Sequence, residues 1–328
     1  MSEPRASFYA HGKLLLSGEY FVLAGARALA LPVRYGQGLD VFEGEEAGVL
    51  QWESLDEKGS KWLQLRFSLP GFELLDGAAS PEAVQLQAVL RAVTALRGGD
   101  ASWLQGRWHQ ASVLQDAALR VCTRLEFPRV WGLGSSSAFL SCLAQWAGVD
   151  AYELLEATFG GSGYDLAAAV ASSPIFFQRL PASADGKPEV LTEPVLLDYP
   201  FREMLYFVHL GRKQNSREGI RRFQQHRAQM DPGLVHRISE LSEAFSICRK
   251  AEDFSALMAE HETLVGKALD MVPLQQAHFP DFPGTLKSLG AWGGDFALAL
   301  SAEPEERLRA YFNQKGLELL LSWDDLVL

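Results

Sequence analysis

The chain has 328 residues, of which 48% are hydrophobic and 11% aromatic, and its formal net charge is −11. This composition supports packed cores and argues against disorder, and the length exceeds what one core usually serves, so we expect two lobes. Because no segment is rich in lysine or arginine, we do not expect nucleic-acid binding or binding to a membrane surface as the main activity.

The cysteines and the hydrophobic segments indicate the compartment. Cys122, Cys142 and Cys248 are scattered and form no CxxC pair, so we expect three buried, reduced thiols rather than a disulfide framework. The N-terminal segment has no apolar signal core, and no apolar run reaches the ~18 residues of a membrane span. We therefore expect a soluble, cytoplasmic protein.

The first 125 residues are predicted to be mostly β structure. Residues 6–33 read as a strand, a glycine turn, a second strand and another turn before a further apolar segment. Residues 34–75 alternate or run apolar between turns, which is typical of strands. A helix is predicted over residues 80–96, because a serine followed by a proline is a start signal. Another strand is predicted over residues 119–125.

A glycine-rich loop, residues 132–137 (Gly-Leu-Gly-Ser-Ser-Ser), follows this strand and enters a predicted helix. Ser135 or Ser136 is expected to cap that helix, because a serine hydroxyl accepts from a free N–H of the first turn. Unpaired N–H groups and the positive end of the helix dipole make the loop a candidate phosphate site. The loop matches neither the P-loop nor the dinucleotide fingerprint, and an ordinary capped turn is the alternative.

A second glycine-rich segment, residues 160–165 (Gly-Gly-Ser-Gly-Tyr-Asp), follows a predicted helix over residues 151–158 that Asp150 is expected to cap. Four small residues let the backbone turn tightly and present Asp165 with little steric cover. The alternative is a flexible loop in which Asp165 starts the next helix.

The remaining chain alternates predicted strands and helices. Residues 181–194 are rich in Pro, Ala, Ser, Asp and Gly, which favours a lobe boundary or an exposed hairpin. Residues 285–301 are predicted to end a helix in glycines and then to enter an apolar strand. The other predicted strands cover residues 175–178, 204–210 and 317–323. The other predicted helices cover residues 216–227, 232–250, 253–271 and 304–315.

The polar side chains give no other strong signal of chemistry. His261 lacks the second histidine of a zinc-protease motif, and the chain has no GxSxG elbow. Arg212, Lys213 and Arg217 either bind a second anion or lie on a solvated loop.

Three stretches, in the right order, resemble the motifs of the superfamily of galactokinase, homoserine kinase, mevalonate kinase and phosphomevalonate kinase (the GHMP kinases). They are residues 11–23 (HGKLLLSGEYFVL), 132–138 (GLGSSSA) and 290–300 (GAWGGDFALAL). Residues 161–170 (GSGYDLAAAV) resemble the segment that carries the catalytic aspartate of the mevalonate branch. The GEY and GSGYD stretches look most like those of bacterial phosphomevalonate kinases.

The resemblance implies a role for each matching residue. Asp165 would orient the attacking group and act on its proton, and Lys13 would lie near the transferred phosphoryl group and lower the pKa of the acceptor. Ser136 would help to hold magnesium. The phosphates of ATP would lie on the loop formed by Gly132, Leu133, Gly134, Ser135, Ser136 and Ser137. The substrate would contact Glu19, Tyr20, Ser162, Gly163, Gly290 and Gly293.

This chain departs from the family pattern in three respects. Just before the second motif, where the family often has prolines and small residues, it has Arg129, Val130 and Trp131. Trp292 and Asp295 interrupt the run of glycines in the third motif, and a bulky indole is expected to narrow that loop. The family's second magnesium-binding carboxylate aligns with no particular residue of this chain. Glu153 and Glu156 lie nearby in the sequence, and we assign this ligand to neither of them.

Taken together, we expect an α+β, two-lobed GHMP-kinase-like fold, with an N-terminal lobe of residues 1–190 and a ferredoxin-like C-terminal lobe of residues 191–328. The resemblance implies a kinase that uses ATP and Mg²⁺ to phosphorylate mevalonate or phosphomevalonate, a small-molecule substrate. A lyase similar to diphosphomevalonate decarboxylase and a non-catalytic nucleotide-binding relative are the alternatives.

Overall fold

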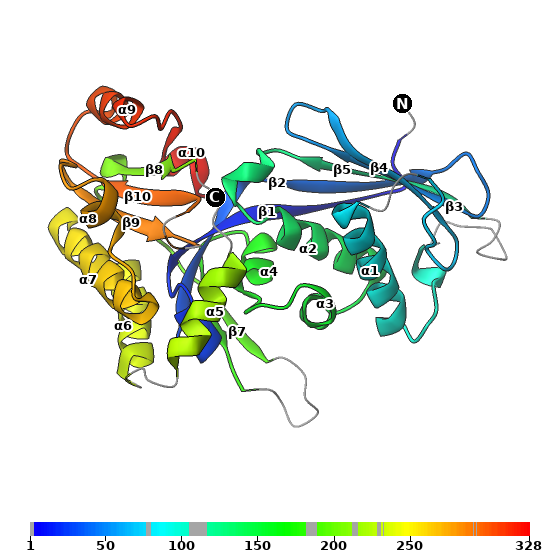
Figure 1. The fold of residues 1–328 in the computed structure, drawn as a ribbon, viewed down its shortest axis with the longest axis horizontal. Coiled ribbons are helices and arrows are strands. Elements are labelled where there is room, and N and C mark those ends of the chain that lie inside the picture. Colours follow the sequence, from blue (N-terminus) through cyan, green and yellow to red (C-terminus); the bar gives the residue numbers. More distant parts are fainter. Residues whose placement is uncertain are drawn as a thin grey trace. The chain divides into compact units, whose positions relative to one another are not determined.

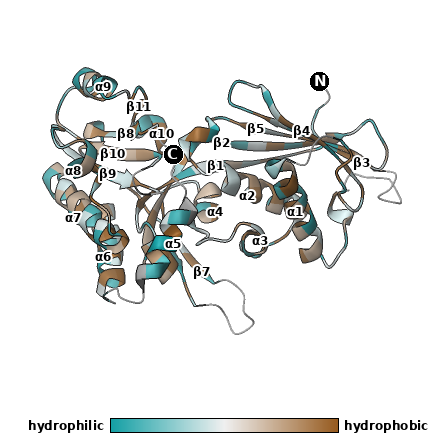
Figure 2. Ribbon diagram, in the orientation of Figure 1, coloured by the Kyte–Doolittle hydropathy of each residue, from teal (hydrophilic) through white to brown (hydrophobic). Residues whose placement is uncertain are grey.

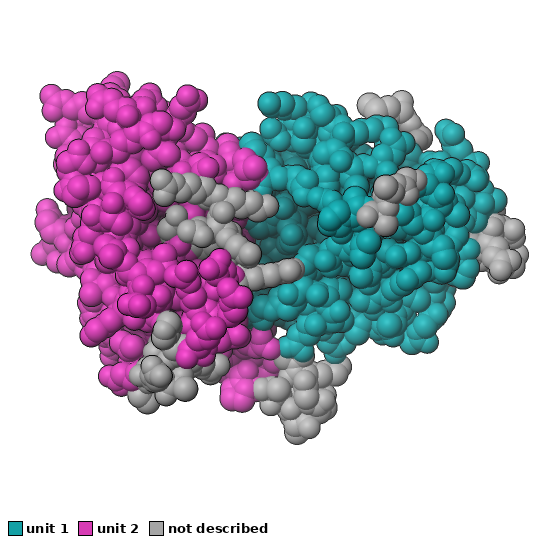
Figure 3. All heavy atoms as spheres, viewed as in Figure 1, with its two compact units in different colours: residues 1–12, 35–129, 134–170 teal, residues 13–34, 130–133, 171–328 magenta. Residues whose placement is uncertain are grey.

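A computed structural model describes residues 3–76, 80–104, 117–181, 189–211, 216–227, 231, 233–290, 292 and 294–328. The chain forms two compact units, each assembled from separate stretches of sequence (Figure 3). The first unit comprises residues 1–12, 35–129 and 134–170, and the second comprises residues 13–34, 130–133 and 171–328. The expected division of the chain after residue 190 stays a prediction.

The first unit consists of a β-sheet with helices packed against it (Figure 1). The strands lie in the order β4-β3-β5-β2, and β1 pairs with β2. β3 and β5 run parallel, whereas β3 with β4 and β2 with β5 are antiparallel. The strand bounds are β1 (Ala6–Ser17), β2 (Ala28–Glu43), β3 (Val49–Leu55), β4 (Lys61–Ser68) and β5 (Ala118–Leu125). Residues 13–17 of β1 and 28–34 of β2 belong to the second unit.

The helices of the first unit are α1 (Pro81–Leu96), α2 (Ser135–Ala147), α3 (Ala151–Thr158) and α4 (Tyr164–Ala169). Of these, α1 and α3 begin directly after residues whose side chains cap them. Ser80 accepts from the N–H of Ala83, and Asp150 accepts from the first turn of α3. Leu90 of α1 and Leu143 of α2 pack with Val121 of the sheet in one core. The predicted start of α1 at Ser80 and the predicted cap of α3 at Asp150 are thus confirmed.

The second unit is built on an antiparallel sheet in the order β11-β8-β10-β9. Its strands are β8 (Leu205–His209), β9 (Thr285–Leu289), β10 (Phe296–Leu300) and β11 (Leu320–Ser322). β10 is hydrophobic along its length and fully buried (Figure 2). In the same unit, residues 28–30 of β2 pair with β6 (Ile175–Arg179), which pairs with β7 (Val190–Pro194).

Helices flank this second sheet. They are α5 (Ser216–Arg227), α6 (Gly233–Ile247), α7 (Ala251–Leu269), α8 (Leu274–His278), α9 (Glu305–Gln314) and α10 (Trp323–Leu326). Leu308 and Phe312 of α9 pack with Tyr206 and Val208 of β8, whereas Phe207, which points to the other face, meets the ring of Trp323. Among the described helices, none is both long enough and apolar enough to cross a membrane.

Two predicted elements are wrong. Residues 285–289 form strand β9 instead of the end of a helix, because a short apolar run carries no decisive period and pairing with β10 settles its conformation. β1 is one continuous strand through Gly12, where a turn was expected. The α+β class with two sheets is confirmed.

Candidate active site

The glycine-rich loop turns through two left-handed glycines before α2. Gly132 has φ +67° and Gly134 has φ +85°, a region that glycine adopts at little cost. The predicted serine cap is wrong, because Gly134 is the N-cap and no side chain caps this helix, all of whose residues are described. The helix therefore starts one residue earlier than expected, and the three serines form its first turn.

The missing cap leaves the first turn of α2 suited to an anion. The first N–H groups of a helix have no partner within the helix, and the dipole favours negative charge there. The three serines differ in what they offer. Ser136 is exposed and Ser135 is half-buried, whereas Ser137 is buried and donates from Oγ to the carbonyl of Gly134 at 2.8 Å. Ser136 thus presents its hydroxyl to solvent, and that of Ser137 is used inside the fold.

Lys13 lies against the beginning of the same loop, within the second unit. Its N–H donates to the carbonyl of Leu133 at 2.9 Å, and Nζ lies 3.5 Å from the carbonyl of Gly132. The backbone bond ties β1 to the loop, which places the ammonium group beside the turn. The structure therefore brings together two predicted features that are more than a hundred residues apart in sequence.

One hydrogen bond and one aromatic contact hold the residues just before the loop in the second unit. The carbonyl of Val130 lies 3.2 Å from Nε2 of His209, and the ring of Trp131 meets that of Phe296 edge-on at 6.1 Å. The loop is thereby anchored to the ends of β8 and β10. Asp295, next to Phe296, places its carboxylate against Gly132.

Asp165 lies in the first turn of α4, which packs against α2 within the first unit. Gly163 (φ +86°) is the N-cap of α4, and a Cβ at that position would lie 2.8 Å from the ring of Tyr152. Burial, then the charges of Asp150 and Asp165, raise the pKa of Tyr152 to about 12. The phenol is thus held neutral in front of Asp165, which is itself half-buried. The helix-starting position that we gave as the alternative is the one observed, and it is compatible with a catalytic role.

A cavity of about 290 Å³ opens in the first unit beside the start of α2. Ser135 and Ser136 line it at one end, and the aromatic rings of Trp52, Trp62 and Phe139 form part of its wall. Arg129 lies over the ring of Trp62 at 3.8 Å from its centre. This cavity was not predicted, since its walls come from strands and helices far apart in sequence.

Two polar atoms in the wall of this cavity have no protein partner among the described residues. They are Oε1 of Gln37, whose side chain is 95% buried, and Nε1 of Trp62. An unsatisfied buried acceptor and donor are each costly, so a ligand that supplies the missing partners is favoured. Among the described lining residues, the cavity thus offers one unsatisfied buried acceptor and one unsatisfied buried donor, together with flat aromatic surfaces.

The first predicted motif is buried. Glu19 is 1% exposed and pairs with Lys287, so it can affect a substrate only through its neighbours. Tyr20, in contrast, is half-buried and its hydroxyl accepts from the N–H of Trp292. Both residues belong to the second unit.

The other predicted substrate residues are placed in part. Ser162 is half-buried and Gly163 is buried, directly before Asp165. Gly290 has φ +66° with open space around it. Gly293, Arg212 and Lys213 lie outside the described residues.

The indole of Trp292 does not narrow the third loop as expected. It is 3% exposed and packs in the core of the second unit with Phe21, Val265 and Leu269. The wide side chain is directed inward because a carboxylate, Glu262, accepts from its Nε1. The third motif thus accommodates a tryptophan without losing the space beside Gly290.

Possible magnesium ligands are few. Within the described residues, no three His, Cys, Asp or Glu side chains gather into a metal-binding group. Glu156 is exposed on α3 and Glu153 is half-buried in its first turn. This donor set fits Mg²⁺ bound to a nucleotide, because that ion usually takes one or two protein ligands plus phosphate oxygens.

The fold has clear relatives among solved structures. Mevalonate kinase from L. major in complex with R-mevalonate is 17% identical, with 98% of each chain covered and a TM-score of 0.61. Streptococcus pneumoniae phosphomevalonate kinase, solved with phosphomevalonate and AMPPNP, is 17% identical over 97% of this chain and 99% of its own, with a TM-score of 0.64. A D-glycero-D-manno-heptose 1-phosphate kinase from Bacteroides thetaiotaomicron is 15% identical over 98% and 95%, with a TM-score of 0.61.

These likenesses cover nearly the whole chain and establish the GHMP kinase fold, as predicted. No model of a protein family matches the sequence, and no curated protein is significantly similar to it.

Proposed function

We propose that this protein is an ATP-dependent kinase that phosphorylates a small metabolite, with mevalonate or phosphomevalonate as the acceptor. The observation that carries the proposal is the cavity of the first unit, with its unpaired acceptor and donor, directly beside the uncapped start of α2. A nucleotide needs both features side by side, one for the base and one for the phosphates.

The cavity fits the adenine base. Oε1 of Gln37 would accept from the exocyclic amine, and Nε1 of Trp62 would donate to a ring nitrogen. A guanine presents a carbonyl where adenine has its amine, which would set two acceptors against each other at Gln37. This pattern favours ATP over GTP.

The phosphates would lie at the first turn of α2. The free N–H groups of that turn would bind phosphate oxygens, and the exposed hydroxyl of Ser136 would supply one oxygen ligand to Mg²⁺. Bound magnesium neutralises charge on the phosphates. Lys13, which lies against the Gly132 carbonyl, would provide a fixed positive charge for the transferred group.

Asp165 would orient the acceptor and take its proton. Phosphoryl transfer depends on alignment and charge stabilisation more than on covalent chemistry, so one positioned carboxylate and one lysine suffice. Support comes from the packing of α4 on α2, which keeps Asp165 in the same unit as the base cavity and the serines.

The identity of the phosphoryl acceptor is the most specific part of the proposal. The GEY and GSGYD sequences resemble those of phosphomevalonate kinases. Structures with this fold include kinases named for mevalonate, phosphomevalonate and a heptose phosphate. A panel of these three acceptors, with ATP, Mg²⁺ and coupled detection of ADP, separates them.

The panel is read with two further measurements. Release of carbon dioxide from diphosphomevalonate would indicate the lyase instead. ATP binding without turnover of any acceptor would indicate a non-catalytic relative, and absence of ATP binding would contradict the proposal altogether.

A further inference from the structure

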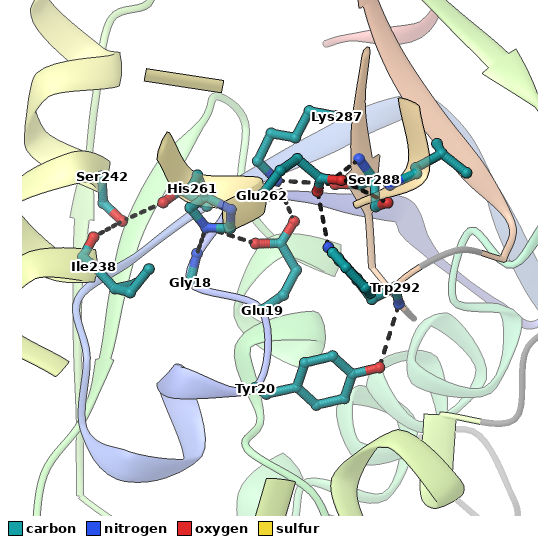
Figure 4. A network of polar contacts seen from close by, with 12 residues as sticks. Gly18, Glu19, Tyr20, Ile238, Ser242, His261, Glu262, Lys287, Ser288 and Trp292 are labelled. Atoms are coloured by element: carbon teal, nitrogen blue, oxygen red, sulfur yellow. Dashed lines mark hydrogen bonds and ion pairs between the residues drawn. The ribbon is translucent and has the colours of Figure 1, made fainter. Parts of the chain in front are cut away.

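A buried polar cluster joins the first and third predicted motifs inside the second unit (Figure 4). We call it the clamp and define it by five residues: Glu19, His261, Glu262, Lys287 and Trp292. Each of them is at most 3% exposed. Charged groups are rarely buried so completely unless they are paired, and their desolvation is expensive.

Lys287 and His261 hold the first-motif turn from two sides. Nζ of Lys287 donates to Oε1 of Glu19 at 2.5 Å and to the carbonyl of Ser288 at 2.9 Å. Nε2 of His261 lies 3.1 Å from Oε2 of Glu19 and 3.2 Å from the N–H of Gly18. The turn is thereby tied to both β9 and α7.

Glu262 holds the third motif. Its Oε1 accepts from Nε1 of Trp292 at 2.8 Å and from the N–H of Ser288 at 3.0 Å. Its Oε2 accepts from Oγ of Ser288 at 3.2 Å and from the N–H of Leu274 at 3.3 Å. One carboxylate thus receives four donors, and the indole is the only one of the four that belongs to the glycine loop.

Tyr20 of the first motif makes a direct hydrogen bond to Trp292 of the third motif. Its backbone is at φ +62° and ψ −40°, a strained conformation for a residue with a side chain. Its ring stacks on Phe223 at 6.1 Å, and its hydroxyl accepts from the N–H of Trp292 at 3.3 Å. Such strain persists only where the surroundings impose it, and the clamp supplies that constraint.

The charges of the clamp agree with this geometry. Burial raises the pKa of Glu19, but the positive charge of Lys287 outweighs it, so that the pKa is lowered and the carboxyl stays ionised. Burial and Lys287 lower the pKa of His261, which stays neutral. Glu19 and Lys287 form the fixed ion pair, and Ser288 connects it to Glu262, because the Ser288 carbonyl accepts from Lys287 and the Ser288 N–H donates to Glu262.

We propose that Glu262 and Lys287 are positioning residues that fix the third glycine loop, through Trp292, to the Gly18–Tyr20 turn. The inference rests on the proposed kinase function, in which these two motifs contact the acceptor. The clamp contains no residue of the base cavity, which lies in the other unit. Loss of the clamp is therefore expected to reduce use of the acceptor more than affinity for the nucleotide.

The test uses the full-length protein and the variants Glu262→Gln, Trp292→Phe and Lys287→Met. The matched control is Tyr199→Phe, which also removes one buried hydrogen bond of the second unit, from the Tyr199 hydroxyl to the carbonyl of Phe245 (2.9 Å), and none of the clamp. Trp292→Phe keeps an uncharged aromatic ring in the core and removes the indole N–H together with part of the ring volume, so it remains informative if the other variants fail to fold.

Two quantities are measured for each variant, kcat/KM for the acceptor and Kd for AMPPNP, and the ¹⁵N–¹H resonance of the Trp292 indole is measured in every variant that keeps Trp292. We expect Glu262→Gln and Lys287→Met to shift the indole resonance. We also expect the clamp variants to lower kcat/KM by about 10- to 100-fold, the effect of a misplaced positioning group, and to change Kd for AMPPNP by a smaller factor. Tyr199→Phe should leave all three unchanged.

Several outcomes would overturn the inference. They are full acceptor turnover in the clamp variants, an indole resonance that does not move in Lys287→Met, or an equal loss in Tyr199→Phe. Failure of the proposed kinase function can be told apart from failure of this inference. In that case the wild-type protein would phosphorylate no acceptor, while the indole resonance would still report whether the clamp anchors the loop.

Discussion

The carboxylate of Asp295 fills the space that a side chain at Gly132 would need. The two residues belong to different predicted motifs, and their contact joins the third glycine loop to the phosphate loop within the second unit. Position 132 therefore requires glycine for two reasons: its φ is positive, and a Cβ there would collide with Asp295.

Replacing Gly132 with alanine is expected to disturb the loop severely. The positive φ alone costs about 1–3 kcal/mol for a residue with a Cβ, and the clash with Asp295 adds to it. We expect AMPPNP binding to be lost, measured by titration calorimetry. The double variant with Asp295→Gly relieves the clash and should recover part of the affinity.

The control for this prediction is Gly316→Ala. Gly316 has a similar φ of +78° and open space around it, so the alanine there tests the backbone cost alone. Equal effects of Gly132→Ala and Gly316→Ala on nucleotide binding would contradict the steric argument.

The base cavity predicts a specific loss of adenine recognition. Gln37→Leu removes the acceptor for the exocyclic amine, and a buried donor left unpaired costs about 1–3 kcal/mol, which is roughly a 5- to 150-fold increase in Kd for ATP. Trp62→Phe removes the donor and keeps the aromatic face. The preference for ATP over GTP, measured by competition, should shrink in Gln37→Leu, and an unchanged preference would remove Gln37 from base recognition.

The two serines that follow each other in α2 should behave differently. Ser136→Ala removes the exposed hydroxyl, so we expect a higher Mg²⁺ concentration for half-maximal turnover. Ser137→Ala removes a buried hydrogen bond to the Gly134 carbonyl and should lower the melting temperature instead, because such a bond contributes about 1 kcal/mol to the free energy of unfolding. A Mg²⁺ titration and a melting curve on both variants check this, and a reversed pattern would exchange their roles.

Asp165→Asn is expected to abolish most turnover without loss of nucleotide. An amide cannot take the proton of the acceptor, and general-base catalysis contributes about 10²- to 10⁴-fold. The measurement is kcat with each acceptor beside Kd for AMPPNP. Glu156→Gln, on the exposed side of α3, is the companion variant: a changed Mg²⁺ dependence there would identify the second carboxylate ligand.

Acid is expected to destabilise the protein through His261. Burial, then the charge of Lys287, lower the pKa of this ring below its usual 6.5 in the folded state. The unfolded chain therefore binds a proton that the folded chain does not, so this contribution to stability is complete above pH 6.5 and decreases below it, by at most about 1.4 kcal/mol per pH unit.

The raised pKa of Glu262 acts in the opposite direction, because the folded protein binds that proton first above pH 4.5. A comparison of variants isolates the histidine. His261→Gln should flatten the fall in unfolding free energy between pH 7 and pH 5 relative to wild type, measured by urea titration. Identical slopes in the two proteins would show that the ring is not held neutral.

Local signals in the sequence determined several elements correctly. The caps at Ser80 and Asp150 and the helix after the glycine loop all depend on residues within a few positions of one another. Their hydrogen bonds form inside one turn of chain, so residue type and spacing suffice to predict them.

The tertiary structure alone decided the rest, because the deciding contacts join residues far apart in the chain. Glu19 and Lys287 are 268 positions apart, and no periodicity relates them. Pairing with β10 made residues 285–289 a strand, and Glu262 drew the indole of Trp292 into the core. The base cavity likewise exists only once strands and helices of the first unit have packed, since free energy of packing, rather than local preference, sets which side chains meet there.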